Sequence, residues 1–460
     1  MGFRLPFPDL LASKNGRLAT FFLLYMTEGI PLGFTATAVA TQMRRQGLGP
    51  EAIGLFVASL YAPWAWKWVA GPFVDTFSSD RFGRRRLWIF LMQLGMVGSL
   101  LAAYNVDFVG NLKLFTMLIF IHNAFGATQD VAIDALAVQV LPEGERGAAN
   151  GFMFGGASVG QTIGGSLALA LTAYMPFKMT FFVVSAVILL VTVFVVLPLR
   201  EKAGPPRVVE AGSKLAAVGR SLWQFVVDAL RAFFGSRAAF VGLLSAILPA
   251  GAYALGLALQ SNLAVELGMD DNAVASLNVW STVIFAVFCI AGGRISDRFG
   301  RRRTLGIFVA ATAIPTAYLA WHMQQAGWIH SIAANAPNRP TPPAGLLTVF
   351  WIAVLTYNVF QGLYYGIRSA LFMDITTPAV AATQFTAYMA LQNLAIQYSA
   401  VWQGMTIVRW GYPKTLLLDC IVGVVPLVLL PFMAPPKRQG GTVEHPAIPP
   451  GAAIPEGVSP

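Results

Sequence analysis

A basic signature occurs twice in this chain, and each copy lies between two long apolar runs. The first copy spans residues 71–86 and the second spans residues 292–303. In both copies a Gly and an Asp stand four positions apart and the block Arg-Phe-Gly-Arg-Arg-Arg follows, although residues 76–80 are inserted in the first copy only. A signature that recurs in the two halves of a 460-residue chain indicates an internal repeat. We therefore expect two halves of similar architecture.

The composition predicts a membrane protein. Hydrophobic residues make up 56% of the chain and charged residues only 11%, whereas soluble domains carry about 25% charged residues. Several apolar runs reach the ~18 residues that cross a hydrocarbon layer as a helix. The net charge of +10 does not indicate nucleic-acid binding, because the basic residues gather in loops beside the apolar runs, where they encode membrane topology.

The apolar runs divide six and six around a polar break, which predicts an all-α membrane protein of twelve transmembrane helices in two six-helix bundles. The runs fall near 18–41, 52–74, 87–105, 112–140, 147–175, 178–199, 239–264, 272–293, 304–324, 346–374, 380–408 and 414–434. The expected segments are therefore a cytoplasmic N-terminus (1–17), an N-terminal bundle (18–199), a linker with an amphipathic helix (200–238), a C-terminal bundle (239–434) and a disordered cytoplasmic tail (435–460).

The distribution of Lys and Arg predicts the orientation. Of 31 such residues, 22 lie in the two ends and the loops that share a side with the basic signatures, and 7 lie in the alternate loops. Both ends are therefore expected in the cytoplasm. The first apolar run has the length of a full helix and no cleavable signal pattern. The two cysteines, Cys289 and Cys420, lie inside apolar runs and predict no disulfide.

Several charged residues fall inside the predicted helices, where each costs at least ~2.5–3.5 kcal/mol on insertion scales and therefore needs a reason. Glu28 lies ~15 Å into the first helix, and Lys67 lies ~12 Å from the basic end of the second. The two residues either neutralise each other or form a proton or ligand switch. Asp130 and Asp134 share one face of the fourth helix, because they are four residues apart.

The second half carries polar groups at similar depth, which suits a central cavity between two bundles. Arg368 lies ~15 Å deep in the tenth helix. The accompanying amide and hydroxyl groups of the tenth and eleventh helices are those of Gln361, Tyr364, Gln392 and Asn393.

The charged groups of the basic signatures and of the nearby helix ends predict a conformational latch. Asp134 and Asp374 lie near the inner ends of the fourth and tenth helices, where they can pair with Arg84–Arg86 and Arg301–Arg303. The expected latch residues are Asp75, Arg84, Arg85, Asp297, Arg298, Arg301, Arg302 and Asp374.

The repeated signature resembles the loop signature of the major facilitator superfamily, Gly-x-x-x-Asp-Arg-x-Gly-Arg-Arg, which lies between helices two and three and between helices eight and nine. The segments EGIPLGF (28–34), YAPWAWKWVAGPFVD (61–75), GATQDVAIDALAVQ (126–139) and AATQFTAYMALQ (381–392) resemble the AmpG-type muropeptide permeases. That branch also contains siderophore permeases and acetyl-CoA transporters. The resemblance implies a proton-driven importer of anhydro-muropeptides in the bacterial inner membrane, with Lys67, Gln129, Asp130 and Asp134 on the family's polar positions.

We therefore expect a secondary active transporter that works by alternating access, uses the proton gradient and needs no metal or other cofactor. The expected proton-coupling residues are Glu28, Asp130 and Asp134. The expected substrate-binding residues are Lys67, Gln129, Gln361, Tyr364, Arg368, Gln392 and Asn393, with Lys67 and Arg368 on carboxylates. The expected partners are a small glycopeptide and membrane lipid, and the chain is expected to be a monomer.

Three alternatives remain open or disfavoured. A siderophore permease of the same branch fits the same residues. An exporter of an amphiphilic small molecule is supported only by the glycine-rich fifth helix, which small-residue packing also explains. A membrane enzyme is disfavoured, because the sequence has no clustered His/Asp, Ser/His or metal-ligand spacing.

Overall fold

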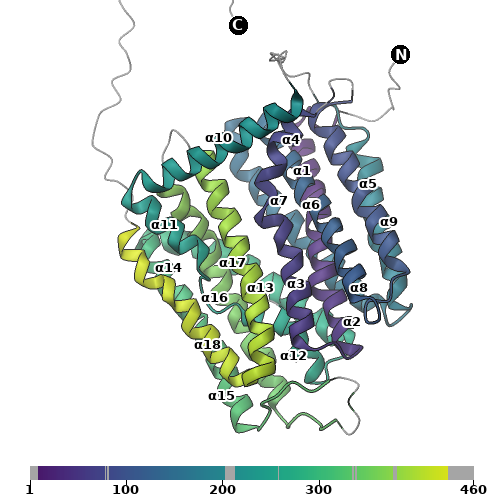
Figure 1. The fold of residues 1–460 in the computed structure, drawn as a ribbon, viewed down its shortest axis with the longest axis vertical. Helices are drawn as coiled ribbons and strands as arrows, with labels where there is room; N and C mark the ends of the chain where they lie inside the picture. Colours follow the sequence, from purple (N-terminus) through teal and green to yellow (C-terminus); the bar gives the residue numbers. More distant parts are fainter. Residues whose placement is uncertain are drawn as a thin grey trace, which may run out of the picture.

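The structure is a computed structural model that describes residues 9–77, 79, 82–201, 213–256, 258–333, 336, 339–376 and 381–433. Within these ranges every regular element is helical (Figure 1). The expected tail at 435–460 lies outside the described residues.

The N-terminal half consists of six passes, four of which are built from consecutive helical pieces. These passes are Lys14–Arg45 (α1, Lys14–Gly33; π-helical Phe34–Val39; α2, Ala40–Arg45), Pro50–Thr76 (α3, Pro50–Ala65; a 3-10 turn, Lys67–Val69; α4, Ala70–Thr76), α5 (Arg84–Tyr104), α6 (Leu112–Val140), Glu143–Leu171 (α7, Glu143–Thr162; π-helical Ile163–Leu167; α8, Ala168–Leu171) and Phe177–Val196 (with α9, Thr180–Val191).

The C-terminal half repeats this arrangement after the linker helix α10 (Lys214–Phe234). Its passes are α11 with α12 (Arg237–Ile247 and Ala258–Glu266), α13 (Asp271–Phe299), α14 with α15 (Arg301–Ala311 and Ala313–Gln325), α16 (Leu346–Asp374), α17 (Ala381–Trp410) and α18 with a 3-10 continuation (Tyr412–Val424 and Val425–Phe432). The twelve-pass, all-α prediction is confirmed.

One predicted helix is wrong in detail. The run 239–264 was expected to be continuous, but α11 ends at Ile247 and α12 begins at Ala258. Gly251 lies in this break with φ +89°, a conformation that a residue with a side chain rarely adopts. The seventh pass is therefore two short helices.

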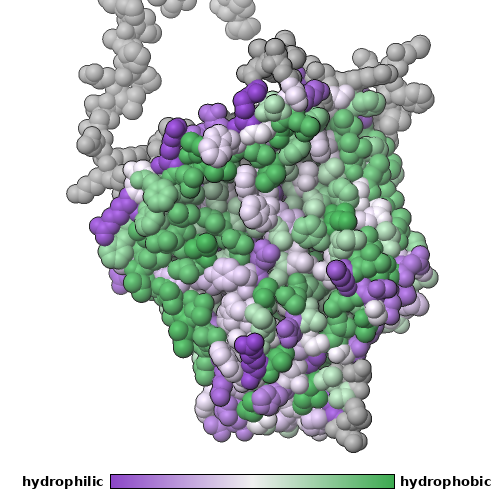
Figure 2. All heavy atoms as spheres, viewed as in Figure 1, coloured by the Kyte–Doolittle hydropathy of each residue, from purple (hydrophilic) through white to green (hydrophobic). Residues whose placement is uncertain are grey.

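Among the described helices, seven stretches are long and apolar enough to cross a membrane by length and composition alone. The other passes are broken, as at Trp66 and in the seventh pass, or carry polar residues, as α6 and α17 do. Figure 2 shows apolar side chains over much of the lateral surface, with hydrophilic groups gathered toward the two ends. Some of the interior polar residues described below, such as Lys67, Asp130 and Asn393, lie on passes outside these seven.

The two ends of the helices are distinguished by what covers them. We call the end that carries the basic signatures and α10 the loop face, and the end that carries residues 46–49 and 267–270 the opposite face. In Figure 1, α10 lies across the loop face from one half to the other. It contacts α4 of the first half and α17 of the second, and its Phe225 ring stacks on Trp68 with centroids 5.0 Å apart.

The fifth pass packs directly against the first. A Cβ atom added at Gly156, Gly160 or Gly164 would lie within 2.2 Å of a backbone oxygen of α1. These glycines are four residues apart and so share one face of α7 and its π-helical extension. Small residues therefore let two backbones touch, as the packing interpretation of this segment predicts.

Substituting Gly160 by Ala should destabilise the protein by about 1–3 kcal/mol, the usual cost of overpacking, because the new methyl group would meet the Met26 carbonyl oxygen at 2.1 Å. The matched control is Gly151→Ala on the same helix, where an added Cβ meets no atom within 4 Å. Thermal unfolding of the purified protein, followed by tryptophan fluorescence, measures both. Equal midpoints for the two variants would contradict the packing role.

Candidate functional site

Lys67 lies where the second pass breaks. Pro63 lies inside α3 and Trp66 leaves helical geometry with φ −107° and ψ 7°, so α3 ends at Ala65. A 3-10 turn begins at Lys67. The Lys67 Nζ donates a hydrogen bond to Asp130 Oδ2 of α6 at 2.5 Å. The Asp130 side chain is 3% exposed and that of Lys67 is 21% exposed. The break thus places a partly accessible ammonium group against a buried carboxylate.

Two further carboxylates surround this ion pair. Glu28 of α1 interacts electrostatically with Asp130, Lys67 and Asp134, and its buried Oε2 atom has no hydrogen-bond partner among the described residues. Asp134 accepts a hydrogen bond from the Tyr25 hydroxyl of α1. We call Glu28, Lys67, Asp130 and Asp134 the carboxylate cluster. One lysine cannot neutralise three carboxylates, so the ionised cluster holds excess negative charge.

The structure decides between the partners that the sequence left open. The ion pair of Lys67 is formed with Asp130, whereas the sequence had suggested Glu28 as a partner. Asp134 bonds to Tyr25 within the bundle; the expected pairing with the basic block Arg84–Arg86 does not occur among the described contacts.

Gln129 lies inside the first half, away from the ion pair. Its side chain is fully buried, and its Nε2 donates to Thr27 Oγ1 at 2.9 Å. Gln93 of α5 donates to the same oxygen at 3.1 Å and accepts a hydrogen bond from Thr192 of the sixth pass. Gln129 therefore belongs to a network that joins four passes of the first half.

Arg368 of α16 caps the end of α11. Its Nη2 donates to the carbonyl oxygens of Ser245 and Leu248 at 3.1 and 3.2 Å, and its Nη1 donates to the Tyr253 hydroxyl at 3.2 Å. The last carbonyls of a helix have no partner within the helix, and a cation there also matches the helix dipole. Arg368 is only 6% exposed, so it is already engaged in holding the broken seventh pass.

A carboxylate holds the other side of the same break. Asp419 of α18 is buried, and its Oδ2 accepts a hydrogen bond from the Ala254 N–H at 2.9 Å, while Gln403 donates to its Oδ1 at 2.8 Å. Sequence reasoning did not include Asp419 among the site residues. The one sequence signal for Asp419 was that a carboxylate lies inside an apolar run. The N–H group that it binds is free only because the seventh pass is broken, and the sequence analysis did not predict that break.

The remaining expected ligands lie along α16 and α17. Tyr364 is buried and Gln361 is half-buried. Gln392 donates to a methionine sulfur one turn earlier, Met389 Sδ, at 3.4 Å. Asn393 donates to the Trp64 carbonyl oxygen of α3 at 3.4 Å, which is a contact between the two halves.

Tyr365 of α16 lies within electrostatic reach of both charged regions. Its side chain is 49% exposed, and it interacts electrostatically with both Arg368 of the second half and Glu28 of the first. Sequence reasoning did not include Tyr365 among the site residues. The structure thus brings together Glu28, Lys67 and Asp130.

The expected latch residues form contacts within each half. Arg85 pairs with Asp75 at 2.5 Å in the first half, and Arg301 pairs with Asp374 at 2.6 Å in the second. Asp75 is 62% exposed and Asp374 36% exposed, and exposed pairs contribute only about 0–1 kcal/mol. These contacts brace the loop face of each half separately.

The other latch residues are less uniform. Arg302 donates to the Pro431 carbonyl oxygen at 3.2 Å. The Arg298 guanidinium lies 5.5 Å from the ring centroid of the next residue, a phenylalanine. Arg84 is also engaged in an interaction. The side chain of Asp297 lies outside the described part of the chain.

The fold consists of two six-helix halves, and charged groups are enclosed among its polar passes. This arrangement is that of a membrane transport protein of the two-bundle type. The chain belongs to the Major Facilitator Superfamily, whose family model matches residues 18–400. Members of this family are transporters and not enzymes, which confirms the prediction on that point. The chain is a multi-pass protein of the bacterial inner membrane, and its substrate is a small molecule.

Curated relatives agree with this family. The chain is 24% identical to the anhydromuropeptide permease of Escherichia coli K12, an alignment that covers 91% of this chain and 79% of the relative. It is 22% identical to the putative transporter AmpG 4 of Rickettsia conorii, covering 91% and 97%. The resemblance to this branch is therefore confirmed.

Solved structures share the fold. A point mutant of the nucleoside transporter NupG superposes with a TM-score of 0.67 at 13% identity, covering 91% of this chain and 99% of that one. The inward-open xylose transporter XylE of E. coli superposes with a TM-score of 0.66 at 15% identity, covering 93% and 98%.

Substituting Arg368 by Gln should destabilise the protein by roughly 1–3 kcal/mol, the cost of leaving buried acceptors without partners. The affected acceptors are the Ser245 and Leu248 carbonyls. Arg409→Gln removes the same charge from an exposed position and is the control. Thermal unfolding without substrate measures both variants. An unchanged midpoint for Arg368→Gln would contradict the capping role and leave Arg368 free for a ligand.

Proposed function

We propose that this protein is a proton-coupled importer of anhydro-muropeptides that works by alternating access. The observation that carries the proposal is the carboxylate cluster, in which a buried Asp130 holds a partly exposed Lys67 beside a buried Glu28 oxygen that no described residue hydrogen-bonds. The similarity to the anhydromuropeptide permease of E. coli supports the substrate class. The proton gradient is the proposed energy source, and no metal or organic cofactor is involved.

The proposed coupling is a competition for Lys67. A carboxylate on the substrate's peptide would displace Asp130 from the lysine, because both anions need the same ammonium group. Asp130 would then be a buried carboxylate without a cation, which is costly in a low-dielectric interior, and uptake of a proton by Asp130 or Glu28 would remove that cost. Substrate and proton thereby favour each other's binding, and by linkage the effect is reciprocal.

The other polar residues have separate proposed roles. Gln361, Gln392 and Asn393 offer amide groups to sugar and peptide, and Tyr364 offers a hydroxyl. Arg368 holds the seventh pass and influences the ligand through Tyr365, and Gln129 positions α6, which carries Asp130. Asp134 is a second, more indirect proton-coupling candidate, since its bond to Tyr25 ties it to α1.

The proposed orientation puts the loop face and both ends of the chain in the cytoplasm, following the bias of basic residues. Import is proposed over export. The glycines of the fifth pass, which alone suggested an exporter, are accounted for by the close approach of α7 to α1.

The deciding experiment is uptake into proteoliposomes with an inward proton gradient. Labelled anhydro-muropeptide is compared with a ferric siderophore, with and without a protonophore. Protonophore-sensitive accumulation of the muropeptide alone supports the proposal. Accumulation of the siderophore alone would overturn the substrate assignment, and muropeptide uptake that ignores the protonophore would overturn the coupling.

Asp130→Asn and Glu28→Gln should each lower gradient-driven accumulation of the muropeptide at least about tenfold, the effect of losing about 1.4 kcal/mol of coupling. Substrate exchange without a gradient should be retained better in Glu28→Gln, because the Lys67–Asp130 pair remains. Glu51→Gln changes an exposed carboxylate and is the control. Full accumulation by both site variants would contradict the proton-coupling role.

A further inference from the structure

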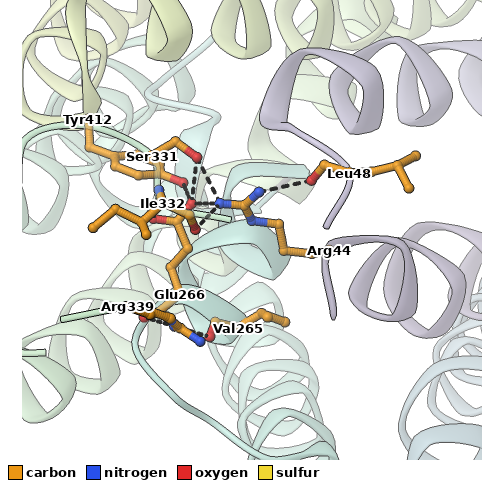
Figure 3. A network of polar contacts seen from close by, with 8 residues as sticks. All are labelled: Arg44, Leu48, Val265, Glu266, Ser331, Ile332, Arg339 and Tyr412. Atoms are coloured by element: carbon orange, nitrogen blue, oxygen red, sulfur yellow. Dashed lines mark hydrogen bonds and ion pairs between the residues drawn. The ribbon is translucent and has the colours of Figure 1, made fainter. Parts of the chain in front are cut away.

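The two halves are joined differently at their two faces. On the opposite face, Arg44 in the last turn of α2 pairs with Glu266 at the end of α12, and both side chains are buried (Figure 3). On the loop face the connection is α10, which lies across the ends of both halves (Figure 1). Unlike the buried pair, α10 presents exposed side chains in every turn. These exposed side chains form a surface that the transport mechanism does not use.

The rotation of α10 about its own axis is fixed by its buried side. The Phe225 ring stacks on Trp68 of the first half at 5.0 Å, and the centroid of the Phe233 ring lies 5.1 Å from that of Tyr388 in α17. Val218, nearer the start of the helix, is also buried. The directions in which α10 exposes its other side chains are therefore set by the fold.

The axis of α10 turns away from the passes. It is bent by 113° from the axis of α11, so α10 runs across the helix ends. Exposed apolar side chains follow α11 at Phe240, Leu244 and Ile247, and the Phe240 ring lies 5.5 Å from that of Phe234 in α10. The apolar surface of a membrane-crossing pass thus continues onto α10. An amphipathic helix in this position lies at the boundary between hydrocarbon and water.

One stripe of α10 is both apolar and exposed. Its members are Trp223, Leu230 and Phe234, whose spacings of seven and four residues place them on one side of the helix. At 100° per residue, this stripe lies about 130° around the helix from the buried Val218 and Ala229. The stripe therefore points away from the passes and extends the apolar surface of α11.

Two exposed arginines border the apolar stripe on the side away from the buried residues. Arg220 and Arg231 are eleven residues apart, so they project within about 20° of each other and ~16 Å apart along the helix. An open hollow of about 330 Å³ lies between them, and it is lined by Arg220, Trp223, Gln224, Val227, Asp228 and Arg231. Two guanidinium groups against one carboxylate give the hollow a net positive charge.

The order of surfaces around α10 matches the cross-section of a lipid leaflet. Buried side chains meet the protein, the apolar stripe comes next, and the arginines follow, as hydrocarbon is followed by the phosphate layer. Guanidinium groups bind phosphate oxygens through two parallel hydrogen bonds. An anionic headgroup also complements the net positive charge, whereas a choline headgroup would bring a further cation beside the arginines.

We propose that Arg220 and Arg231 form a binding site for the phosphate groups of anionic phospholipid in the leaflet that contacts the loop face. Trp223, Leu230 and Phe234 lie in the acyl-chain region of the same leaflet. The site is separate from the carboxylate cluster. The proposal does not depend on the substrate, on the direction of transport or on the coupling ion.

The first experiment measures which lipid the full chain retains. The protein is placed in nanodiscs that contain phosphatidylglycerol and phosphatidylcholine in equal amounts, and native mass spectrometry after release counts the molecules of each lipid that stay bound. The test variant is Arg220→Gln with Arg231→Gln, and the two single variants are made as well, so that the test stands if the double variant does not fold. Lys214→Gln is the matched control, because it removes an exposed cation of the same helix outside the hollow.

The parent protein should retain phosphatidylglycerol in preference to phosphatidylcholine. The double variant should lower the ratio of the two retained lipids at least about tenfold, each single variant should lower it less, and Lys214→Gln should keep the parent ratio. Equal retention of the two lipids by the parent protein would overturn the proposal. So would a parent ratio in the arginine variants, or an equal loss in Lys214→Gln, which would indicate general attraction by basic residues.

The second experiment measures the depth of the apolar stripe. A nitroxide label is attached at Leu230→Cys or at Ser221→Cys, an exposed position nine residues away and so on the opposite side of the helix, with Cys289→Ala and Cys420→Ala in the background. Power-saturation electron paramagnetic resonance compares collisions with oxygen, which concentrates in hydrocarbon, and with a water-soluble nickel complex. Oxygen should dominate at position 230 and nickel at position 221. Dominant nickel collisions at position 230 would show that the stripe faces water and would overturn the proposal.

Discussion

Hydrocarbon offers no hydrogen bonds, so a chain that carries broken helices and charges into it must satisfy them with its own groups. The seventh pass shows how far this constraint reaches. Its break frees carbonyl groups on one side and N–H groups on the other, and Arg368 and Asp419 reach them from the tenth and twelfth passes. The sign of each charge matches the helix end that it meets. The second half is held together around this irregularity.

The first half uses a break in a different way. At Lys67 the helix is interrupted to direct a charged side chain inward, and the partner comes from α6. Both halves thus pair a basic residue with an interrupted pass, but only the first leaves its cation partly exposed, whereas Arg368 is buried. This difference makes Lys67 the better candidate for a ligand contact and Arg368 the better candidate for a structural one.

The sequence predicted the elements well and the contacts unevenly. Hydropathy and the repeated basic signature were sufficient for twelve passes in two halves. Hydropathy cannot detect a break within an apolar run, although Pro249 and Gly251 were a usable signal. Gln129 and Asp130 are adjacent in sequence, yet a rotation of about 100° per helical residue sends one into the bundle and the other toward Lys67. The Arg44–Glu266 pair joins segments 222 residues apart, so no local sequence pattern predicts it.

The close contact of α3 with α17 has a consequence for how the two halves come together. A Cβ atom at Gly54 would lie 2.6 Å from the Ala400 carbonyl oxygen, and one at Gly404 would lie 2.7 Å from that of Pro50. Dispersion attraction between such backbones falls by about a quarter to a half for a gap of only ~0.5–1 Å, whereas the attraction between opposite charges decays slowly with distance. The charges of Arg44 and Glu266 therefore have the longer capture range. They guide the halves toward each other, and the glycine contact fixes their final register.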